Sequence, residues 1–154
     1  MIPLFTLQVT LCVLVVDQVL KAITGSRIGQ VFPANPGSIA LFPAVNESNA
    51  LGVTERLFLT LALLAGIVLI SKYLSFQRDF RLRLGAGLLA GGALGNGLSW
   101  IFQGYVIDYL AISCRDTEVI VNLADLAYVC GTLLVAFGTA REVRLLLKKT
   151  LVKE

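Results

Sequence analysis

Residues 84–107 read LGAGLLAGGALGNGLSWIFQGYVI, a run of 24 residues that contains no charged side chain. Arg83 and Asp108 bracket the run, so charge marks both of its ends. A helix of about 20 mostly apolar residues is long enough to cross the hydrocarbon core of a bilayer. The run therefore predicts a membrane-spanning helix, and the rest of the chain is interpreted outward from it.

The flanking sequence supplies three more apolar runs, at residues 2–23, 57–74 and 119–140. The composition agrees, because 56% of the 154 residues are hydrophobic and only 15% are charged, whereas a soluble domain carries about 25% charged residues. We therefore predict an all-α membrane protein with four transmembrane helices, forming one integral membrane domain over residues 1–154. Three spans behind a signal peptide are a weaker alternative, because residues 1–16 contain no Lys or Arg and no small-residue cleavage site follows.

Basic residues indicate which helix ends face the cytoplasm. Nine of the thirteen Lys and Arg residues fall between the second and third spans or after the fourth. Short loops and tails rich in Lys and Arg stay on the cytoplasmic side of a membrane. With four spans, both termini are then cytoplasmic, and residues 24–55 and 108–118 face outward.

The outer stretch 24–55 differs in amino-acid composition from the spans. It holds three of the four prolines and four glycines. Such residues interrupt regular structure, and here they separate short β-like pieces at residues 28–32 and 38–45. We expect a small sheet or hairpin that rests at the outer membrane–water interface.

Ionisable and polar groups inside the spans are costly, so each is a candidate functional residue. Asp17 and Lys21 lie four residues apart on one face of the first span. They form either a helix-end ion pair that anchors the span or a part of a functional site. Asn96, Ser99 and Gln103 form a polar stripe on the third span, which by itself is more typical of hydrogen bonds between helices.

Gly87, Gly91 and Gly95 recur at every fourth position of the third span. Small residues at this spacing let the backbone of a neighbouring helix approach closely. The stripe therefore predicts tight packing rather than chemistry, and that packing would hold Asn96 in a fixed place.

Asp108 and Asp125 are the most informative pair. Asp108 follows the third span on the outer side, and Asp125 is expected about two turns into the fourth span, after a short loop. Asn122 precedes Asp125 by three residues and shares its face. The two carboxylates can therefore meet at a similar depth. Spacing alone leaves open that Asp108 is an exposed loop acid and that Asp125 is a structural partner of Lys21 or Arg115.

Two carboxylates a few ångström apart cannot both ionise, so they share a proton. The ionised acid can take a proton from water while the other protonates a carbonyl oxygen, as in aspartic proteases. The chain contains no histidine, which excludes Ser-His and Cys-His nucleophiles and histidine-ligated metals. A small proton-coupled carrier would use similar acids, but such carriers are usually built from internal repeats, and this sequence has none. The modest net charge of +3 suggests no nucleic-acid partner.

Four short blocks resemble the lipoprotein signal peptidase (signal peptidase II) family. Residues 91–96, GGALGN, followed by residues 104–109, GYVIDY, are similar to its GGALGN…GxVxDF block. Residues 122–125, NLAD, resemble its FNxAD block, residues 17–21, DQVLK, its DQxxK block, and residues 46–52, NESNALG, its NxGxAFG block. The blocks follow the family's order and cover most of the chain, so the combination is specific.

The resemblance implies four transmembrane helices with a small extracytoplasmic β-cradle, in the cytoplasmic (inner) membrane of a bacterium, with the active site near the outer face. It implies an aspartic endopeptidase, with no cofactor or metal, that removes the signal peptide from diacylglyceryl-modified prolipoproteins before the lipobox cysteine. Its partners are the prolipoprotein and membrane lipids, and we expect a monomer. By motif, Asp108 and Asp125 match the catalytic dyad, Asn46, Asn96 and Asn122 line the substrate site, and Asp17 and Lys21 support it.

The third span departs from the family pattern after Asn96. Ser99 and Trp100 stand where the family has an acid and an arginine, at positions that we assign to substrate binding. Such departures indicate a divergent member or paralogue in which the dyad is retained. They leave one alternative function, a lipid- or lipopeptide-binding relative with reduced or altered cleavage.

Overall fold

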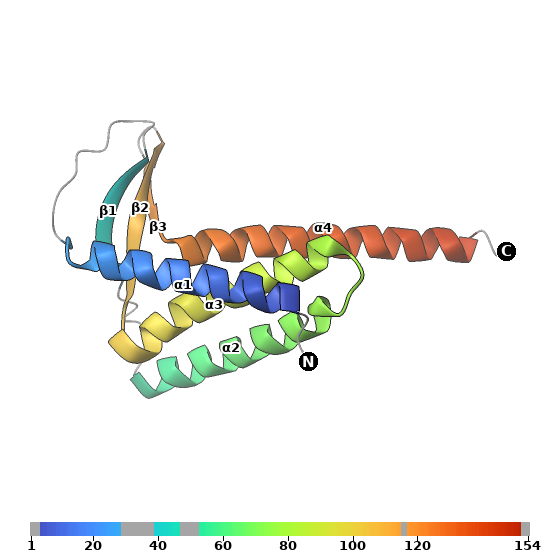
Figure 1. Ribbon diagram of the computed structural model, residues 1–154, viewed down its shortest axis with the longest axis horizontal. Coiled ribbons are helices and arrows are strands. Elements are labelled where there is room, and N and C mark those ends of the chain that lie inside the picture. The colour runs from blue at the N-terminus through green and yellow to red at the C-terminus, as the bar shows by residue number, and fades with distance from the viewer. Residues whose placement is uncertain (1–3, 29–38, 47–52, 115–116, 152–154) are drawn as a thin grey trace.

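The computed structural model describes residues 4–28, 39–46, 53–114 and 117–151 of the chain. Four helices pack roughly parallel or antiparallel to one another, and a small sheet lies at one end of them (Figure 1). The mostly helical class with a small added sheet, predicted from the sequence, is confirmed. In chain order the elements are α1 (Leu4–Gly25), β1 (Ile39–Asn46), α2 (Val53–Ser75), α3 (Phe80–Gln103), β2 (Val106–Cys114), β3 (Thr117–Val121) and α4 (Leu123–Leu151).

Helix α3 lies at the centre and packs against each of the other three helices. It begins after Asp79, whose carboxylate accepts a hydrogen bond of 2.8 Å from the backbone N–H of Arg81. It ends at Gly104, which has φ 77° and donates its N–H to the carbonyl of Trp100. A left-handed residue of this kind closes a helix, and glycine adopts it without steric cost. The predicted span of 84–107 was therefore placed too late, since its last residues belong to β2.

Glycines bring α3 into close contact with α1. A Cβ atom on Gly87 would lie 2.7 Å from the Cβ of Val9, and one on Gly91 would lie 2.7 Å from the Cβ of Val13. One on Gly95 would lie 2.9 Å from a carboxylate oxygen of Asp17. The predicted small-residue stripe is confirmed as the surface on which α1 rests.

A second glycine contact, which the sequence analysis did not identify, joins α3 to α4. A Cβ atom on Gly92 would collide with the carbonyl oxygen of Ala124. One on Gly131 would lie 2.8 Å from both the carbonyl oxygen of Gly85 and the backbone nitrogen of Leu89. On α3, Gly85 and Gly92 face α4, whereas Gly87, Gly91 and Gly95 face α1. The central helix therefore has a glycine surface toward each of two neighbours.

The three strands form one antiparallel sheet in the order β1-β2-β3. Strand β1 pairs with β2 so that Ala44 lies opposite Asp108 and Asn46 opposite Val106, with a bulge between Leu41 and Ala44. The predicted β-like piece at 38–45 is thereby confirmed within β1, whereas residues 29–32 of the other predicted piece lie outside the described residues.

The prediction of a short loop before the fourth span was wrong, because that segment contains β2 and β3, which pair as a hairpin. Residues 119–121 belong to β3, so α4 begins at Leu123 instead of residue 119 and continues to Leu151 instead of residue 140. Val119, Ile120 and Val121 are β-branched, and such a run suits a strand as well as it suits a helix that spans a membrane. The described parts of the apolar runs 2–23 and 57–74 lie within α1 and α2.

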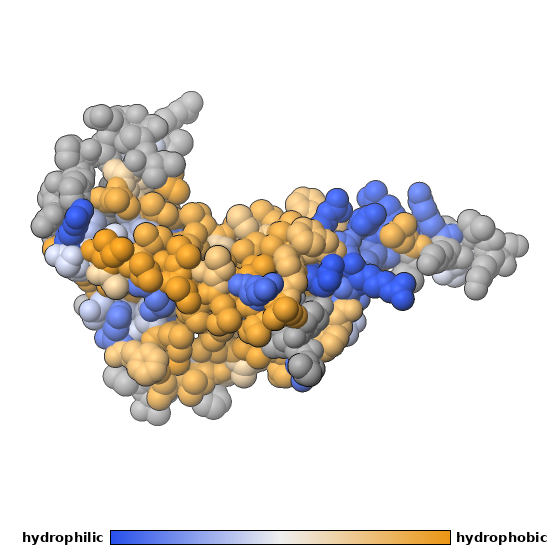
Figure 2. Space-filling view, viewed as in Figure 1, coloured by the Kyte–Doolittle hydropathy of each residue, from blue (hydrophilic) through white to orange (hydrophobic). Residues whose placement is uncertain are grey.

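Two helices have the length and apolar composition needed to cross a bilayer, Leu4–Gly25 and Leu123–Leu145. Only 22% of each is buried within the protein, so most of their apolar side chains face outward. Helix α2 contributes a shorter apolar stretch, Thr60–Leu74. Figure 2 shows an apolar surface over the middle of the helices, with hydrophilic residues gathered over the C-terminal half of α4. An exposed apolar surface of this extent is typical of a site that contacts a membrane or another protein.

The glycine contact gives a direct test of the packing. We expect Gly91→Ala to lower the free energy of unfolding by about 1–3 kcal/mol, the usual cost of overpacking, because its new methyl group would meet Val13 and the carbonyl oxygen of Thr10. Thermal unfolding of the purified protein in detergent measures this change. Gly66→Ala on α2 is the matched control, since no atom lies within 4 Å of its added methyl group. Equal melting temperatures for the two variants would contradict the packing described.

Candidate active site

Asp108 and Asp125 lie together, joined by one residue. Asp108 is on β2, and Asp125 is in the first turn of α4 rather than two turns into it, because α4 begins at Leu123. Asn122 stands between β3 and α4 and contacts both acids. Its side-chain Nδ2 donates to Oδ1 of Asp108 at 2.6 Å, and its backbone N–H donates to Oδ2 of Asp125 at 3.1 Å. Asn122 therefore hydrogen-bonds to both acids, to Asp108 through its side chain and to Asp125 through its backbone.

The amide of Asn122 is held in one orientation. Its Oδ1 accepts the backbone N–H of Asp125 at 2.9 Å, while Asp125 accepts the backbone N–H of Asn122. This reciprocal pair is a helix N-terminal cap, which satisfies N–H groups that have no partner within the helix. Since Asn122 is fully buried, the cap also fixes the NH₂ group that faces Asp108.

Asp108 is itself almost completely buried. Its second oxygen, Oδ2, accepts a hydrogen bond of 3.0 Å from Nδ2 of Asn46 on β1. Burial raises the pKa of the Asp108 carboxyl, and the nearby charge of Asp125 raises it further, against the opposing effects of Asn46, Asn122 and Lys21. A raised pKa beside a second carboxylate is the condition under which two acids hold one proton between them.

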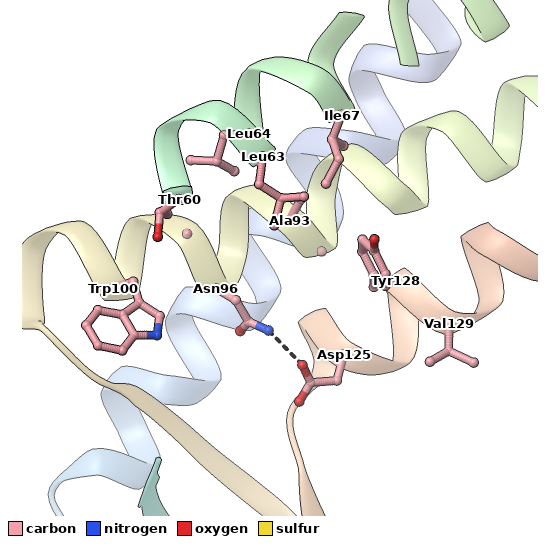
Figure 3. Close-up of a pocket in the computed structure, with 12 residues that line it drawn as sticks. Thr60, Leu63, Leu64, Ile67, Ala93, Asn96, Trp100, Asp125, Tyr128 and Val129 are labelled. Carbon is pink, nitrogen blue, oxygen red and sulfur yellow. Dashed lines mark hydrogen bonds between the residues drawn. The ribbon is translucent and has the colours of Figure 1, made fainter. Parts of the chain in front are cut away.

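Asp125 receives its second donor from α3. Nδ2 of Asn96 donates to Oδ1 of Asp125 at 2.7 Å, as the dashed line in Figure 3 shows. The other end of the Asn96 amide accepts a hydrogen bond of 2.7 Å from Nζ of Lys21, which also pairs with Asp17 at 2.8 Å. Asp17 and Lys21 are both buried, so they are an internal pair and not an anchor at the helix surface.

Asp17 in turn holds the start of α4. One of its oxygens accepts the backbone N–H of Ala124 at 3.1 Å and the hydroxyl of Tyr109 at 3.5 Å. The same hydroxyl accepts the backbone N–H of Leu123 at 3.0 Å. Burial raises the pKa of Tyr109 to about 12, so the hydroxyl keeps its proton and remains able to donate to Asp17.

Sequence reasoning did not assign a role to Tyr109 or to Gln18. Tyr109 follows Asp108 on a strand, and successive side chains of a strand point to opposite faces; that alternation was the available signal. Gln18 donates through Nε2 to the carbonyl of Gly95 at 2.8 Å and lies 3.3 Å from the hydroxyl of Ser99. Gln18 thus connects α1 to α3, and Tyr109 connects β2 to α1 and to the start of α4.

A cavity of about 440 Å³ opens beside Asp125, between α2, α3 and α4 (Figure 3). Asn96 and Trp100 line it together with Asp125 at its polar part. Most of the remaining wall is apolar: Leu63, Leu64, Ile67, Ala93 and Val129. Concave apolar sites with a few converging polar groups are typical of ligand-binding pockets.

The predicted substrate-binding residues divide between this cavity and the interior. Ser99 does not line the cavity, because its buried hydroxyl donates to the carbonyl of Gly95 at 3.1 Å and faces α1. Asn46 and Asn122 lie on the Asp108 side of the dyad. Among the described residues, no group of three or more His, Cys, Asp or Glu side chains is placed to hold a metal ion.

Comparisons with known proteins agree on one family. The family model described as Signal peptidase (SPase) II matches residues 9–141. A lipoprotein signal peptidase of Pelotomaculum thermopropionicum is 33% identical over 142 residues, covering 88% of this chain and 91% of the relative. One of Gloeothece citriformis is 33% identical over 117 residues, covering 71% and 72%.

Two solved structures of bacterial membrane enzymes share the fold. They superpose with TM-scores of 0.75 and 0.72, at sequence identities of 21% and 23%. The first alignment covers 90% of this chain and 88% of the solved chain, and the second covers 87% and 91%. The arrangement of helices and sheet is therefore that of known membrane enzymes.

The Tyr109 hydroxyl offers a test of the network behind the carboxylates. We expect Tyr109→Phe to destabilise the protein by about 1–3 kcal/mol, because it leaves the partly buried N–H of Leu123 without its acceptor. Thermal unfolding in detergent measures the loss. Tyr73→Phe, which removes the hydroxyl of an exposed tyrosine on α2, should unfold at the wild-type temperature. A Tyr109→Phe variant as stable as this control would show that the hydroxyl does not hold α4.

Proposed function

The chain belongs to the signal peptidase II family, and we propose that it is an aspartic endopeptidase that removes the signal peptide from diacylglyceryl-modified prolipoproteins before the lipobox cysteine. Family membership makes it a membrane protease of lipoprotein processing. The observation that carries the aspartic mechanism is the contact of Asp108 and Asp125 with the single residue Asn122. Two acids so placed, Asp108 buried and Asp125 half-buried, can share a proton and act in turn as acid and base.

The reaction needs only these two acids and a water molecule. The ionised carboxylate takes a proton from water while the water oxygen bonds to the carbon of the scissile amide. The protonated acid gives its proton to the carbonyl oxygen, which yields a neutral tetrahedral diol. When the C–N bond breaks, the first acid passes its proton to the leaving nitrogen, and a hydroxyl of the diol returns one to the second acid. The pair ends with one proton, as it began.

The membrane arrangement is part of the proposal. All four helices of the single domain 1–154 cross the membrane, with both termini cytoplasmic and the dyad near the outer face. Support comes from Figure 1, in which the α2–α3 connection and the C-terminal end of α4 lie at the end opposite the sheet. Basic residues gather at that end, at Arg81 and Arg83 of α3 and at Arg141, Arg144 and Lys148 of α4. The enzyme acts as a monomer among membrane lipids.

The substrate is bound by residues on both sides of the dyad. Asn46 and Asn122 lie beside Asp108, and Asn96 lies beside Asp125, so their amides flank the place of the scissile bond. Trp100 adds a large apolar face to the cavity, which suits the apolar part of a lipid-modified substrate. Ser99 supports α3 from behind, through Gly95, without reaching the substrate.

Cleavage of a lipid-modified lipobox peptide by the purified protein in detergent tests the dyad. We expect Asp108→Asn and Asp125→Asn each to lower kcat/KM by about 10³-fold or more, because either change removes one half of the acid–base pair. Asp79→Asn, which alters a carboxylate outside the dyad at the start of α3, should keep wild-type activity. Binding of the peptide by wild type without any cleavage would instead favour a lipopeptide-binding role.

Trp100 should govern which substrates are accepted. We expect Trp100→Arg to raise kcat/KM on an ordinary lipobox peptide several-fold, because arginine brings five donors and a fixed charge to the cavity wall. The companion change Ser99→Asp should add only instability, since it buries a carboxylate against the Gly95 carbonyl. Phe102→Arg, two residues further along α3 and exposed, controls for added charge. An equal response to both arginines would show that Trp100 does not set preference.

A further inference from the structure

The ammonium group of Lys21 is fully occupied. An ammonium has three N–H donors and no acceptor. Its three neighbours are all acceptors: Oδ2 of Asp17 at 2.8 Å, Oδ1 of Asn96 at 2.7 Å and the carbonyl of Gly95 at 3.4 Å. Because Lys21 is buried on α1 and each donor has a partner, it has no freedom to turn toward another group.

This arrangement determines which end of the Asn96 amide faces Asp125. The carbonyl oxygen of the amide must point to Lys21, because an ammonium cannot accept a hydrogen bond. The NH₂ group is therefore directed at Oδ1 of Asp125. The other oxygen of Asp125 faces a backbone N–H, that of Asn122, which also can only donate. Both oxygens of Asp125 thus face obligatory donors, which is an environment for a carboxylate and not for a carboxylic acid.

The environment of Asp108 is less restricted. Its Oδ1 faces the NH₂ group of Asn122, whose orientation is fixed by the Asp125 backbone. Its Oδ2 faces the amide of Asn46, which is exposed at the end of β1. Within the described part of the chain, the Asn46 amide bonds to no group except Asp108. Among the described residues nothing else holds this amide, and a rotated amide would present its carbonyl oxygen to accept a hydrogen bond from a protonated Asp108.

We propose that Lys21 is a positioning residue which, through the fixed amide of Asn96, keeps Asp125 as the ionised acid and places the shared proton on Oδ2 of Asp108. This inference rests on the proposed function, because it assigns the two roles within the same dyad. Asp125 then takes the proton from water, and Asp108 gives its proton to the scissile carbonyl. The raised pKa of Asp108, caused chiefly by its burial, agrees with that assignment.

Among the described residues, few charged or titratable groups surround the dyad. Helix α1 contributes Asp17 and Lys21, and β2 contributes Tyr109 beside Asp108. Tyr128 of α4 lines the cavity next to Asp125. The described cavity-lining residues of α2 and α3 carry no charge, so the donors and acceptors above are the main influence on where the proton lies.

Thermal unfolding in detergent tests the donor pattern without reference to activity. We expect Asp125→Asn to unfold about 5 °C below Asp108→Asn. The new NH₂ group at residue 125 must face a donor in either orientation, the NH₂ group of Asn96 or the N–H of Asn122, whereas that of Asp108→Asn can face a rotated Asn46. Asp79→Asn shows the effect of neutralising a carboxylate outside the dyad that accepts a backbone N–H and pairs with exposed Arg141. Equal melting temperatures for the two dyad variants would overturn the proposal.

A double exchange then tests the role of Lys21 and Asn96. In the variant that combines Asn96→Asp with Asp125→Asn, the new carboxylate faces both Lys21 and the new amide. Every donor again has an acceptor, and the net charge is unchanged. We expect the exchange to recover the stability lost in Asp125→Asn. Recovery also supports the proposal if Asp125→Asn alone cannot be purified, and an exchange no more stable than the single variant would overturn it.

The pH profile of kcat/KM separates positioning from mere structural support. In the variant that combines Asp17→Asn with Lys21→Met, the pair is removed without changing the net charge, and residue 17 keeps an oxygen for the N–H of Ala124. The Asn96 amide is then free to turn away from Asp125. We therefore expect the acid limb of the pH profile of kcat/KM to move to higher pH by about one unit. A lower kcat with both limbs unmoved would overturn the proposal. If wild type cleaves no lipid-modified peptide, the proposed function fails. The order of the melting temperatures of Asp108→Asn and Asp125→Asn still tests the hydrogen-bond donors around the two acids.

Discussion

The rest of the structure depends on the buried carboxylate of Asp17. It pairs with Lys21 on its own helix, accepts the Ala124 N–H at the start of α4, and contacts the Tyr109 hydroxyl on β2. A charge enclosed between helices is tolerated only when its oxygens are satisfied, and removal of one partner from such a pair costs about 3–5 kcal/mol. One side chain of α1 therefore fixes how α4 and the sheet meet.

That fixation is possible because glycine replaces side chains where the helices meet. Gly95 leaves room for the Asp17 carboxylate, and its carbonyl receives both Gln18 and Lys21. Gly92 allows the start of α4 to rest directly on α3. The polar contacts thus depend on the close approach of the helices, since a larger residue at either glycine would separate the donors from their acceptors.

The sequence predicted the four helices and the dyad because each rests on a local signal. Long uncharged runs specify helices, and isolated carboxylates at their outer ends specify candidate acids. The ends of α3 and α4 were missed because Val106, Ile107 and residues 119–121 are apolar and β-branched, a composition that fits a span or a strand. Ser99 was assigned to substrate binding, but its hydroxyl faces α1. Residues at helical spacing share one face of a helix, and that spacing does not indicate which neighbour the face contacts. Tyr109 and Gln18 depend on contacts between distant segments, which periodicity does not encode.

The two acids differ in how firmly they are held, and that difference follows from the elements that carry them. Asp125 sits in the first turn of a helix, where its backbone and side chain close a cap with Asn122. Asp108 sits on the middle strand of a three-stranded sheet, and its free oxygen depends on Asn46 at the exposed end of an edge strand. In the described sheet β1 is an edge strand, and the free side of an edge strand can be approached by an extended peptide. The start of α4 packs on α1 and α3, with Asp125 at the wall of the cavity between α2, α3 and α4. Under the proposed mechanism, Asp125 would activate water at the wall of the cavity, and Asp108, whose partner Asn46 lies on the edge strand, would give its proton to the carbonyl of an arriving chain.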